Sequence, residues 1–392
     1  MIRLEDATSL ILQHARPLGV ERLPLEQAIG RILAEDVEAP RDAPATAVSA
    51  MDGYAVCDGD FAGGNRTLTV VGEARAGRAY EAPLRSGTCV RIFTGAPLPR
   101  NADRVIMQEN AQVVGAAATF GDCVTGPNHV RARGSDFQAG DRLLKAGQRL
   151  SSLAVVAAGA ADLAAVRVWR RPRIAILSTG DELVEPGQAG LAPDRIPDSV
   201  SLGIQALVQA WGGEVVRRVR LGDDLATLRG AAESALAAAD LVVVTGGASV
   251  GEYDLAKAMF CPLELVFSKV AMKPGKPVWF GRSRSKPVIG LPGNPTAAMI
   301  TGRLLLAPLV AGLSGARPDA ALAWREGRLG APLTGGDSRD HFLCGRGDRT
   351  VEALRSQDSS GQKSLGQAEL LIRLSAGASP RAPGDGVQVL DF

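Results

Sequence analysis

Cysteine, histidine and net charge are all scarce in this sequence. The 392 residues include five Cys, and no two of them stand in a CxxC pair. A disulfide framework or a structural zinc site is therefore not expected, and a reducing compartment is favoured. The three His residues lie far apart in the sequence, which argues against metal or triad chemistry built on histidine.

Charge of one sign and long apolar runs are also missing. The 44 basic and 42 acidic residues leave a net charge of +2, so bulk charge predicts neither a nucleic-acid nor a membrane partner. The first residues, MIRLEDATSL, do not contain the apolar core of a signal sequence. The longest mildly apolar stretch, 153–166, includes Asp162, is mostly Ala and is too short to span a membrane. We expect a cytoplasmic protein, and the length predicts two to four domains.

Lysine is rare, and its distribution is uneven. Seven of the 44 basic residues are Lys, and four of these seven, Lys257, Lys269, Lys273 and Lys276, fall within 20 residues. Lysine carries a compact, strongly hydrated charge, which arginine does not. The cluster is either a solvated face or a site that needs compact cations for an oxyanion.

The first 170 residues contain two kinds of pattern. Apolar residues at helical spacing predict helices over 5–16 and 24–36, and an Ala-rich helix over 151–166. Between them, a Pro-rich connector at 40–46 leads into short β-like runs separated by Gly and Pro, from about 48 to 145. This pattern predicts a separate β-rich lobe.

Beyond residue 172, apolar strands alternate with helices. The expected strands are RIAILS (173–178), EVVRRVRL (214–221), DLVVV (240–244) and PVIGL (287–291), and the expected helices are 199–211, 225–239 and 295–306. This alternation predicts a doubly wound, parallel α/β domain. Short strands and Gly/Pro turns from about 317 onward predict a small C-terminal β domain.

Three unusual loops follow strands of the predicted sheet, at 178–182, 245–251 and 291–295. Ligands of open α/β sheets bind at the carboxyl ends of the strands, and glycine-rich turns can direct backbone N–H groups at anionic oxygens. A tight turn alone is the alternative. The binding residues expected here are Thr179, Gly180, Asp181, Gly246, Gly247, Ser249, Gly251, Pro292, Gly293, Asn294 and Pro295, with Lys276 beside them.

Carboxylates stand beside these loops. Asp181, Glu182 and Asp254 are the expected ligands of Mg²⁺, a hard cation that prefers oxygen and bridges to phosphate. Asp223 and Asp224 precede a predicted helix, and N-capping explains them equally well. In the β-rich lobe, single polar residues follow short strands in SAMDGYAV (49–56), RIFTGAP (91–97) and HVRARGSD (129–136), and physics alone does not assign them.

Seven motifs occur in the order SAMDGYAV, RIFTGAPLP with NADRVIMQE, HVRARGSDFQAGD, AILSTGDELVEPG, VVTGGASVGEYD, KPGKP and GLPGNP. Over about residues 25–310 the chain thereby resembles the molybdopterin molybdenumtransferase family. The resemblance implies an elongated homodimer of four-domain subunits, with a cleft between the α/β domain of one subunit and the β-rich lobe of the other. The implied domains are a helical domain at 1–40 and 140–171, the β-rich lobe at 41–139, a three-layer α/β/α molybdopterin-binding domain at 172–313 and the C-terminal β domain at 314–392.

The resemblance also implies a reaction. Molybdopterin-AMP and molybdate are the substrates, AMP is cleaved off with Mg²⁺, and molybdenum is delivered to the dithiolene. The catalytic residues carried over by motif are Asp52, Thr94, Asp136, Glu182, Asp223, Asp254, Lys269 and Lys273. A molybdopterin adenylyltransferase and recipient molybdoenzymes are the implied partners.

Some positions depart from the family pattern. Val200 replaces a usual Asn, DAPATAV before SAMDGY lacks the usual Phe-Asp-Asn run, and Gln367-Ala368-Glu369 stands where Ala-Asn is common. A non-catalytic molybdopterin-binding scaffold on the same fold is the alternative, but a scaffold need not keep the acidic set.

Adenylation of molybdopterin is a further alternative, and the β-rich lobe argues against it. The sequence does not distinguish molybdate from tungstate as the substrate.

Overall fold

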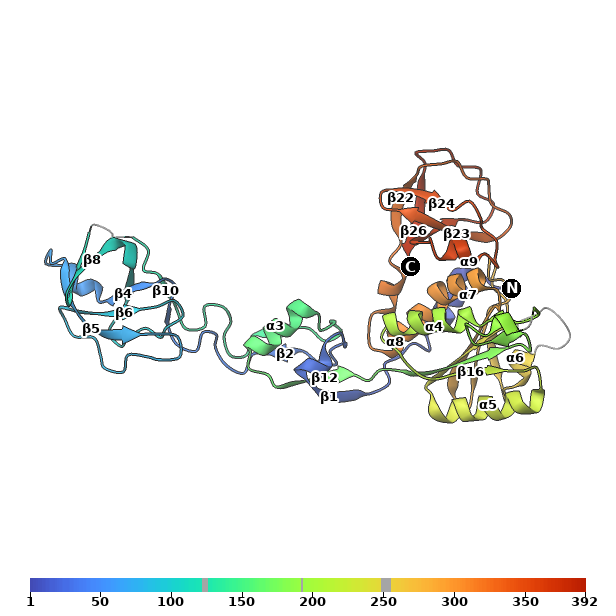
Figure 1. Ribbon diagram of the computed structural model, residues 1–392, viewed down its shortest axis with the longest axis horizontal. Coiled ribbons are helices and arrows are strands. Elements are labelled where there is room, and N and C mark those ends of the chain that lie inside the picture. The colour runs from blue at the N-terminus through green and yellow to red at the C-terminus, as the bar shows by residue number, and fades with distance from the viewer. Residues whose placement is uncertain (122–125, 192, 248–254) are drawn as a thin grey trace.

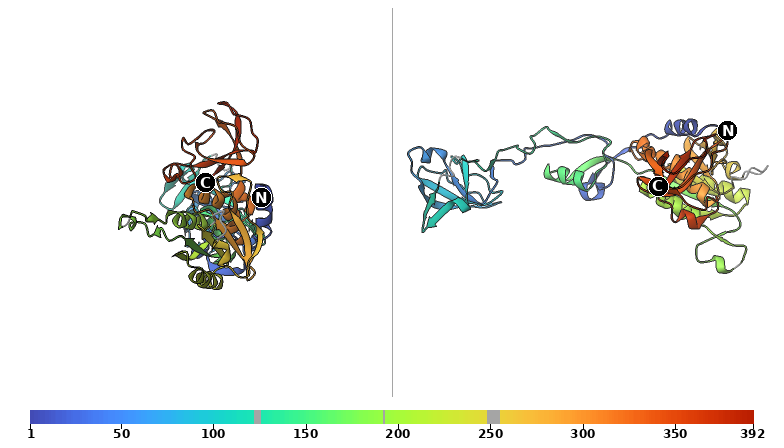
Figure 2. Two further views of the ribbon diagram at one scale, coloured as in Figure 1. Left: turned by 90° about the vertical axis from the view of Figure 1, so that its right-hand side faces the viewer. Right: turned by 90° about the horizontal axis from the view of Figure 1, so that it is seen from above.

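The computed structural model describes residues 1–121, 126–191, 193–247 and 255–392. The molecule is elongated, with a β-rich lobe at one end, a small central part, and an α/β domain with a C-terminal β domain at the other end (Figure 1). The view from above shows the same separation of the lobe from the α/β domain (Figure 2). The multidomain α/β plus β fold class is confirmed.

Two distant stretches of chain build the central part. Its strands pair antiparallel as β1 (Val20–Pro24) with β12 (Ala165–Trp169) and β2 (Val37–Glu38) with β11 (Arg142–Leu144). Its helices are α2 (Leu25–Ala28) and α3 (Ser152–Ala160). The buried side chains of both stretches, such as Leu33, Leu150 and Val168, share one core.

The structure corrects two helix predictions here. The expected helix 24–36 is only the four residues of α2, because the backbone N–H groups of Gly30 and Leu33 donate to Leu150 and Gln148 of the other stretch. The expected helix 151–166 ends at Ala160, and a turn at Asp162, whose φ is 67°, leads into β12. In both places pairing with a distant segment overrides helical spacing.

The N-terminal helix belongs elsewhere. The helix predicted over 5–16 is present as α1 but ends earlier (Leu4–Leu12), and Leu4, Ala7 and Ile11 pack into the core of the α/β domain and not into the central part.

The β-rich lobe is confirmed as a six-stranded sheet of order β7-β4-β6-β5-β9-β8. Its strands are β4 (Gly53–Val56), β5 (Thr67–Ala74), β6 (Thr88–Ile92), β7 (Arg104–Met107), β8 (Ala111–Val114) and β9 (Ala117–Phe120). A further pair, β3 (Val48–Ser49) with β10 (Val130–Arg131), lies where the chain enters and leaves the lobe.

The α/β domain has a six-stranded sheet of order β16-β13-β17-β21-β20-β18. The strands are β13 (Arg173–Thr179), β16 (Glu214–Leu221), β17 (Leu241–Thr245), β18 (Glu264–Phe267), β20 (Trp279–Ser283) and β21 (Lys286–Leu291). The helices are α4 (Ser199–Ala210), α5 (Leu225–Ala238), α6 (Leu255–Ala258), α7 (Pro295–Thr301) and α8 (Ala307–Leu313). α4, α7 and α8 lie on one side of the sheet and α5 on the other, and a separate apolar core fills each side (Figure 1).

The sheet is parallel across β16, β13, β17 and β21, as predicted, but its other edge is antiparallel. β20 returns into β21 through a two-residue turn in which Arg284 and Ser285 have φ of 48° and 64°. This is a hairpin geometry that Asn-Gly usually marks, so the sequence carried no signal for it.

The predicted helix 295–306 extends to Leu313, with a π-helical turn at Gly302–Leu306. Within the described ranges, Pro295–Leu313 is the one helix long and apolar enough to cross a membrane, and 94% of its apolar window is buried inside the protein. Burial of that extent is typical of a core helix.

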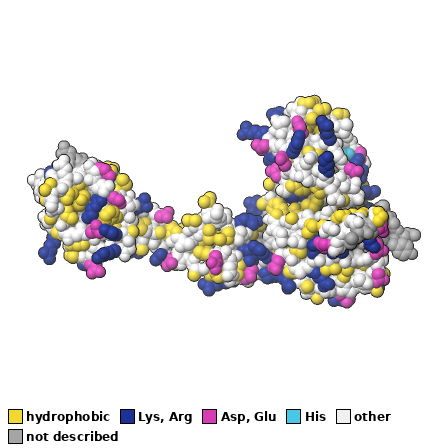
Figure 3. All heavy atoms as spheres, viewed as in Figure 1, with side chains coloured by type: hydrophobic (Ala, Val, Ile, Leu, Met, Phe, Trp, Pro, Cys, Tyr) yellow, Lys and Arg dark blue, Asp and Glu magenta, His cyan; other side chains and the backbone are white. Residues whose placement is uncertain are grey.

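The C-terminal domain is a sheet of order β19-β23-β24-β22-β26-β25. Its strands are β19 (Met272–Lys273), β22 (Arg325–Leu329), β23 (Asp340–Gly347), β24 (Thr350–Ala353), β25 (Leu370–Leu374) and β26 (Gly386–Asp391), and α9 (Gln362–Leu365) lies beside them. β19 comes from the chain of the α/β domain, so the two domains share a sheet. Hydrophobic side chains gather along their junction, and basic and acidic side chains are interspersed over the visible face (Figure 3).

Candidate functional site

The loop after β13 brings a carboxylate back over a glycine. Gly180 has a φ of +146°, and a Cβ atom at this position would lie 2.6 Å from Oε2 of Glu182. The positive φ favours glycine here, and without a Cβ atom at this position Glu182 can fold back over the loop. Thr179 before it is buried.

The second loop presses against the first, and the third loop presses against the second. Gly246 has a φ of +87°, and a Cβ atom there would lie 2.4 Å from the carbonyl oxygen of Thr179. A Cβ atom on Gly293 would lie 3.3 Å from Cα of Gly246. The structure thus brings the described parts of the three loops together at the carboxyl ends of β13, β17 and β21. Ser249, Gly251 and Asp254 lie outside the described residues.

A cavity of about 610 Å³ opens between these loops, and we call it the loop cavity. Eight predicted site residues line it: Thr179, Glu182, Gly246, Gly247, Pro292, Gly293, Asn294 and Pro295. Leu183, Ile196 and Val200 give it an apolar wall, and Ser360 and Gln362 of the C-terminal domain complete it.

Asp198, the residue directly before α4, also lines the loop cavity. Its buried carboxylate accepts the N–H of Ser201 at 3.2 Å and the hydroxyl of Ser201 at 2.7 Å. It therefore caps α4 and presents a charge to the cavity wall at the same time.

Three carboxylates lie close together beside the loop cavity. Oδ1 of Asp181 accepts the backbone N–H of Asp223 at 3.0 Å. Partial burial, and then the charges of Asp181 and Glu182, raise the pKa of Asp223 above its ordinary value. Mutual repulsion of this kind favours a bound cation. Asp224 has another role, because its side chain accepts the N–H of Thr227 at 2.8 Å and caps α5.

Among the residues that the structure describes, no three His, Cys, Asp or Glu side chains meet the geometry of a metal cage. Mg²⁺ does not require one, since it is usually held by one or two carboxylates together with phosphate oxygens and water. Glu182, which lines the cavity, and the adjoining Asp181 and Asp223 fit that kind of site.

A second cavity of about 710 Å³ adjoins the first, and we call it the lysine cavity. Its basic lining consists of Lys273, Lys276, Arg339 and His341, and no described Asp or Glu lines it. The loop cavity has the opposite character, with Glu182 and Asp198 but no described Lys or Arg. The two cavities share Pro277, Pro292 and Asn294 in their walls.

The four clustered lysines therefore have different positions. Lys273 and Lys276 line the lysine cavity, whereas Lys269 is exposed and lines neither cavity. The carbonyl oxygen of Lys269 accepts the N–H of Ile2 at 3.0 Å, which fixes the start of the chain. Lys257 lies on α6 with its Nζ 5.8 Å from the ring centre of Trp279.

The sequence missed Arg339 and His341. Their place in the site comes from the pairing of β19 with β23, in which Lys273 stands opposite His341. A pairing between residues almost 70 positions apart leaves no local pattern. Ser359 of the same domain was also missed, although the Ser- and Gly-rich texture of SQDSSGQ was a usable signal.

The residues expected from the β-rich lobe lie far from both cavities. Oδ1 of Asp52 accepts the backbone N–H of Thr94 at 2.8 Å and its hydroxyl at 2.7 Å. These bonds lower the pKa of Asp52. Asp136 is exposed in a nearby loop, where its N–H donates to the carbonyl oxygen of Ala43 at 3.0 Å. The lobe and the α/β domain lie at opposite ends of the elongated molecule, so a single chain does not bring these residues to its own cavities (Figure 1).

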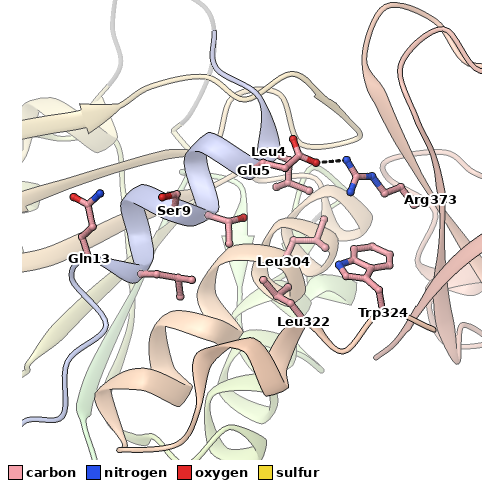
Figure 4. A pocket seen from close by; sticks show the side chains of 10 residues that line it. Leu4, Glu5, Ser9, Gln13, Leu304, Leu322, Trp324 and Arg373 are labelled. Carbon is pink, nitrogen blue, oxygen red and sulfur yellow. Dashed lines mark hydrogen bonds and ion pairs between the residues drawn. The ribbon is translucent and has the colours of Figure 1, made fainter.

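A third cavity, of about 670 Å³, is lined by none of the predicted site residues that the structure describes. It lies between α1 and the C-terminal domain, with Leu304, Leu322 and Trp324 as its apolar wall (Figure 4). Glu5 and Arg373 form an ion pair across its rim. We call it the α1 groove.

Two family models match the chain. Residues 2–161 match the MoeA N-terminal region (domain I and II), and residues 175–312 match the probable molybdopterin binding domain. Together these matches cover the lobe, the central part and the α/β domain.

Curated relatives and solved structures agree with the family models. A molybdopterin molybdenumtransferase of Haemophilus influenzae is 37% identical over 318 residues, which is 80% of this chain and 78% of the relative. The molybdopterin molybdenumtransferase 2 of Mycobacterium tuberculosis is 34% identical over 97% of this chain and 96% of its own. The structure of the molybdopterin biosynthesis MoeA protein of Pyrococcus horikosii superimposes with a TM-score of 0.86 at 30% identity, covering 100% of this chain and 99% of that one. The chain therefore belongs to the molybdopterin molybdenumtransferase family, a family of transferases in molybdenum cofactor biosynthesis.

Proposed function

We propose that this protein inserts molybdate into adenylylated molybdopterin and releases AMP in a reaction that depends on Mg²⁺. One observation carries the proposal: a cavity with carboxylates and a cavity with lysines adjoin each other and share Pro292 and Asn294. The reaction needs both kinds of chemistry, because one substrate carries a phosphoanhydride and the other is a dianion.

The loop cavity suits adenylylated molybdopterin. Its apolar wall of Leu183, Ile196 and Val200 suits a flat ring system, and the glycine loops offer backbone N–H groups to anionic oxygens. Val200, which replaces the usual Asn of the family, forms part of this wall, so the departure leaves the cavity in place.

The lysine cavity suits molybdate. Lys273, Lys276 and Arg339 supply full positive charges around a space without described carboxylates in its lining, and a dianion is held best by such groups. The shared wall at Asn294 then puts the oxyanion next to the pterin, where the metal is needed.

Magnesium fits the carboxylate side of the cleft. When bound, Mg²⁺ would neutralise the charge that develops on the phosphate oxygens as AMP leaves. Glu182 would hold the ion from the cavity wall, with Asp181 and Asp223 beside it. No described Cys or His lines the loop cavity as a covalent nucleophile, so positioning and charge neutralisation carry the chemistry.

A second copy of the chain would complete the site. The β-rich lobe, which carries Asp52 and Thr94, lies at the opposite end of the molecule from the α/β domain, and Asp136 follows β10 where the chain leaves the lobe. A homodimer in which each lobe reaches the cavities of the partner subunit would bring them into the cleft. Asp52 would arrive ionised, because Thr94 keeps its pKa low.

The remaining assignments follow from this reaction. A molybdopterin adenylyltransferase would supply the substrate, and molybdoenzymes would receive the product. The described cysteines, Cys57, Cys89, Cys261 and Cys344, are all free, which supports the proposed cytoplasmic location.

The decisive experiment is AMP release from molybdopterin-AMP by the purified protein with Mg²⁺, with and without molybdate, coupled to reactivation of an apo-molybdoenzyme. We expect AMP release that depends on molybdate and is accompanied by reactivation. Glu182→Gln should abolish AMP release, while Glu214→Gln, at an exposed strand end, should not. Tight binding of molybdopterin-AMP without AMP release would support the scaffold function instead.

A further inference from the structure

One carboxylate contacts three of the four basic side chains that line the lysine cavity. Oδ2 of Asp337 lies 3.8 Å from Nζ of Lys273 and 3.1 Å from Nη2 of Arg339. Its other oxygen, Oδ1, lies 3.0 Å from Nε2 of His341. Asp337 itself is not part of the lining.

This carboxylate carries its full negative charge. Hydrogen bonds from His341 and Arg339 hold the pKa of Asp337 well below its usual range. Neighbouring Asp340 pairs with Arg373, which does not line the lysine cavity. Asp337 is therefore the described carboxylate that offsets the positive charge of the lysine cavity.

We propose that Asp337 is a built-in counter-ion of the lysine cavity, which weakens oxyanion binding so that the bound oxyanion can be passed on. The inference rests on the proposed function, because it takes the lysine cavity as the molybdate site. An entering dianion competes with Asp337 for Lys273 and Arg339. When the oxyanion leaves, Asp337 forms its ion pairs with these two side chains again.

Such a device suits a site that delivers its ligand. A cavity with three uncompensated cations, those of Lys273, Lys276 and Arg339, would hold a dianion tightly and slow its transfer to the neighbouring pterin. A counter-ion in contact with the cations lowers the field in the cavity without occupying its volume. The side chains of Asp337 and Lys273 are 41% and 55% exposed, so both can move when the ligand exchanges.

The charge of Asp337 can be separated from its structural role. Oδ1 of Asp337 also accepts the backbone N–H of Arg339 at 2.9 Å, and its carbonyl oxygen accepts the N–H of Gly377 at 2.7 Å. Asparagine keeps a side-chain oxygen for the first bond and leaves the second unchanged. Asp337→Asn therefore removes the charge and keeps the turn.

The test is calorimetric titration of the full-length protein with molybdate and with tungstate, at low and at high salt. Asp337→Asn should bind either oxyanion about three- to tenfold more tightly than the unmodified protein, with the gain shrinking as salt rises. Asp319→Asn is the matched control, since it removes the same charge from a pair with Arg317 outside the cavity lining, and should change nothing. Asp337→Ser, which can also cap the turn, is the second charge-removing variant and should behave like Asp337→Asn.

The outcomes separate this inference from the proposed function. Lys273→Gln should weaken oxyanion binding if the lysine cavity is the molybdate site. If Lys273→Gln weakens binding but both Asp337 variants bind no more tightly than the unmodified protein, the counter-ion role is wrong and the site stands. If Lys273→Gln changes nothing, or if the unmodified protein binds neither oxyanion, the molybdate site and this inference both fall.

Discussion

The side-chain amide of Asn294 donates a hydrogen bond from Nδ2 to Oγ of Ser359 across 3.1 Å. This bond joins the loop after β21 to the C-terminal domain at the wall that the two cavities share. The backbone N–H of Thr296 donates to the carbonyl oxygen of Ser359 at 3.0 Å and reinforces the contact. The C-terminal domain thus helps to shape the cleft.

Removing the Ser359 hydroxyl should loosen that wall. We expect Ser359→Ala to raise the KM for molybdopterin-AMP and to lower the free energy of unfolding by about 0.5–1.5 kcal/mol, the net value of one hydrogen bond. Steady-state kinetics and urea denaturation measure the two effects. Ser375→Ala, at an exposed serine of the same domain, is the control, and equal effects of the two substitutions would contradict this role.

Asp198 should contribute to stability through its cap. Asp198→Ala should lower the free energy of unfolding by about 1–2 kcal/mol, because the N–H and hydroxyl of Ser201 lose their acceptor. Asp224→Ala removes the exposed cap of α5 and should cost less. Denaturation curves measure the free energy of unfolding of both variants. A larger loss for Asp224→Ala than for Asp198→Ala would contradict the view that burial makes the Asp198 cap the more stabilising of the two.

The pKa of Asp52 should depend on Thr94. The backbone N–H of Thr94, and then its hydroxyl, lower this pKa. Asp52 therefore stays ionised when the pH falls below the ordinary pKa of an Asp side chain. Thr94→Val removes the hydroxyl bond and should raise the pKa. The acid limb of the rate profile should then begin at a higher pH than in the unmodified protein. NMR titration of the Asp52 carboxyl group checks the direction, and a pKa that is unchanged or lower would contradict it.

The cysteines should differ sharply in reactivity. Burial raises the pKa of Cys89 to about 12 and that of Cys344 to about 11, so neither forms thiolate near pH 8. Cys261 is exposed. A thiol reagent followed by mass spectrometry should label Cys261 at once and label Cys89 and Cys344 only after unfolding. Rapid labelling of Cys89 in the folded protein would show that the core of the lobe opens readily.

The sequence predicts the α/β domain well and the central part poorly, for one physical reason. Strands such as β13 and β17 are buried on both faces, so each is a continuous apolar run that can be recognised from the sequence alone. The segment 24–36 has helical spacing, but its backbone pairs with residues more than 100 positions away, which no local pattern records.

The site divides in the same way. Loops at the carboxyl ends of strands could be located from strand order alone, and Glu182 and Asn294 lie in them. Arg339 and His341 enter the lysine cavity through the C-terminal domain, which no rule of strand order ties to the α/β sheet. Lys269 is the converse case, because it is close in sequence to Lys273 but lines neither cavity of this chain.

The central claim is that the β-rich lobe of one subunit and the cavities of the other subunit form one cleft. Co-expression of two inactive variants tests this claim most directly. Asp52→Asn and Glu182→Gln subunits carrying different tags would be purified as mixed dimers and assayed for AMP release that depends on molybdate. Each variant alone should be inactive, whereas the mixed dimer has one intact cleft and should recover about half of the unmodified activity. A mixed dimer as inactive as its parents would contradict a cleft shared between subunits.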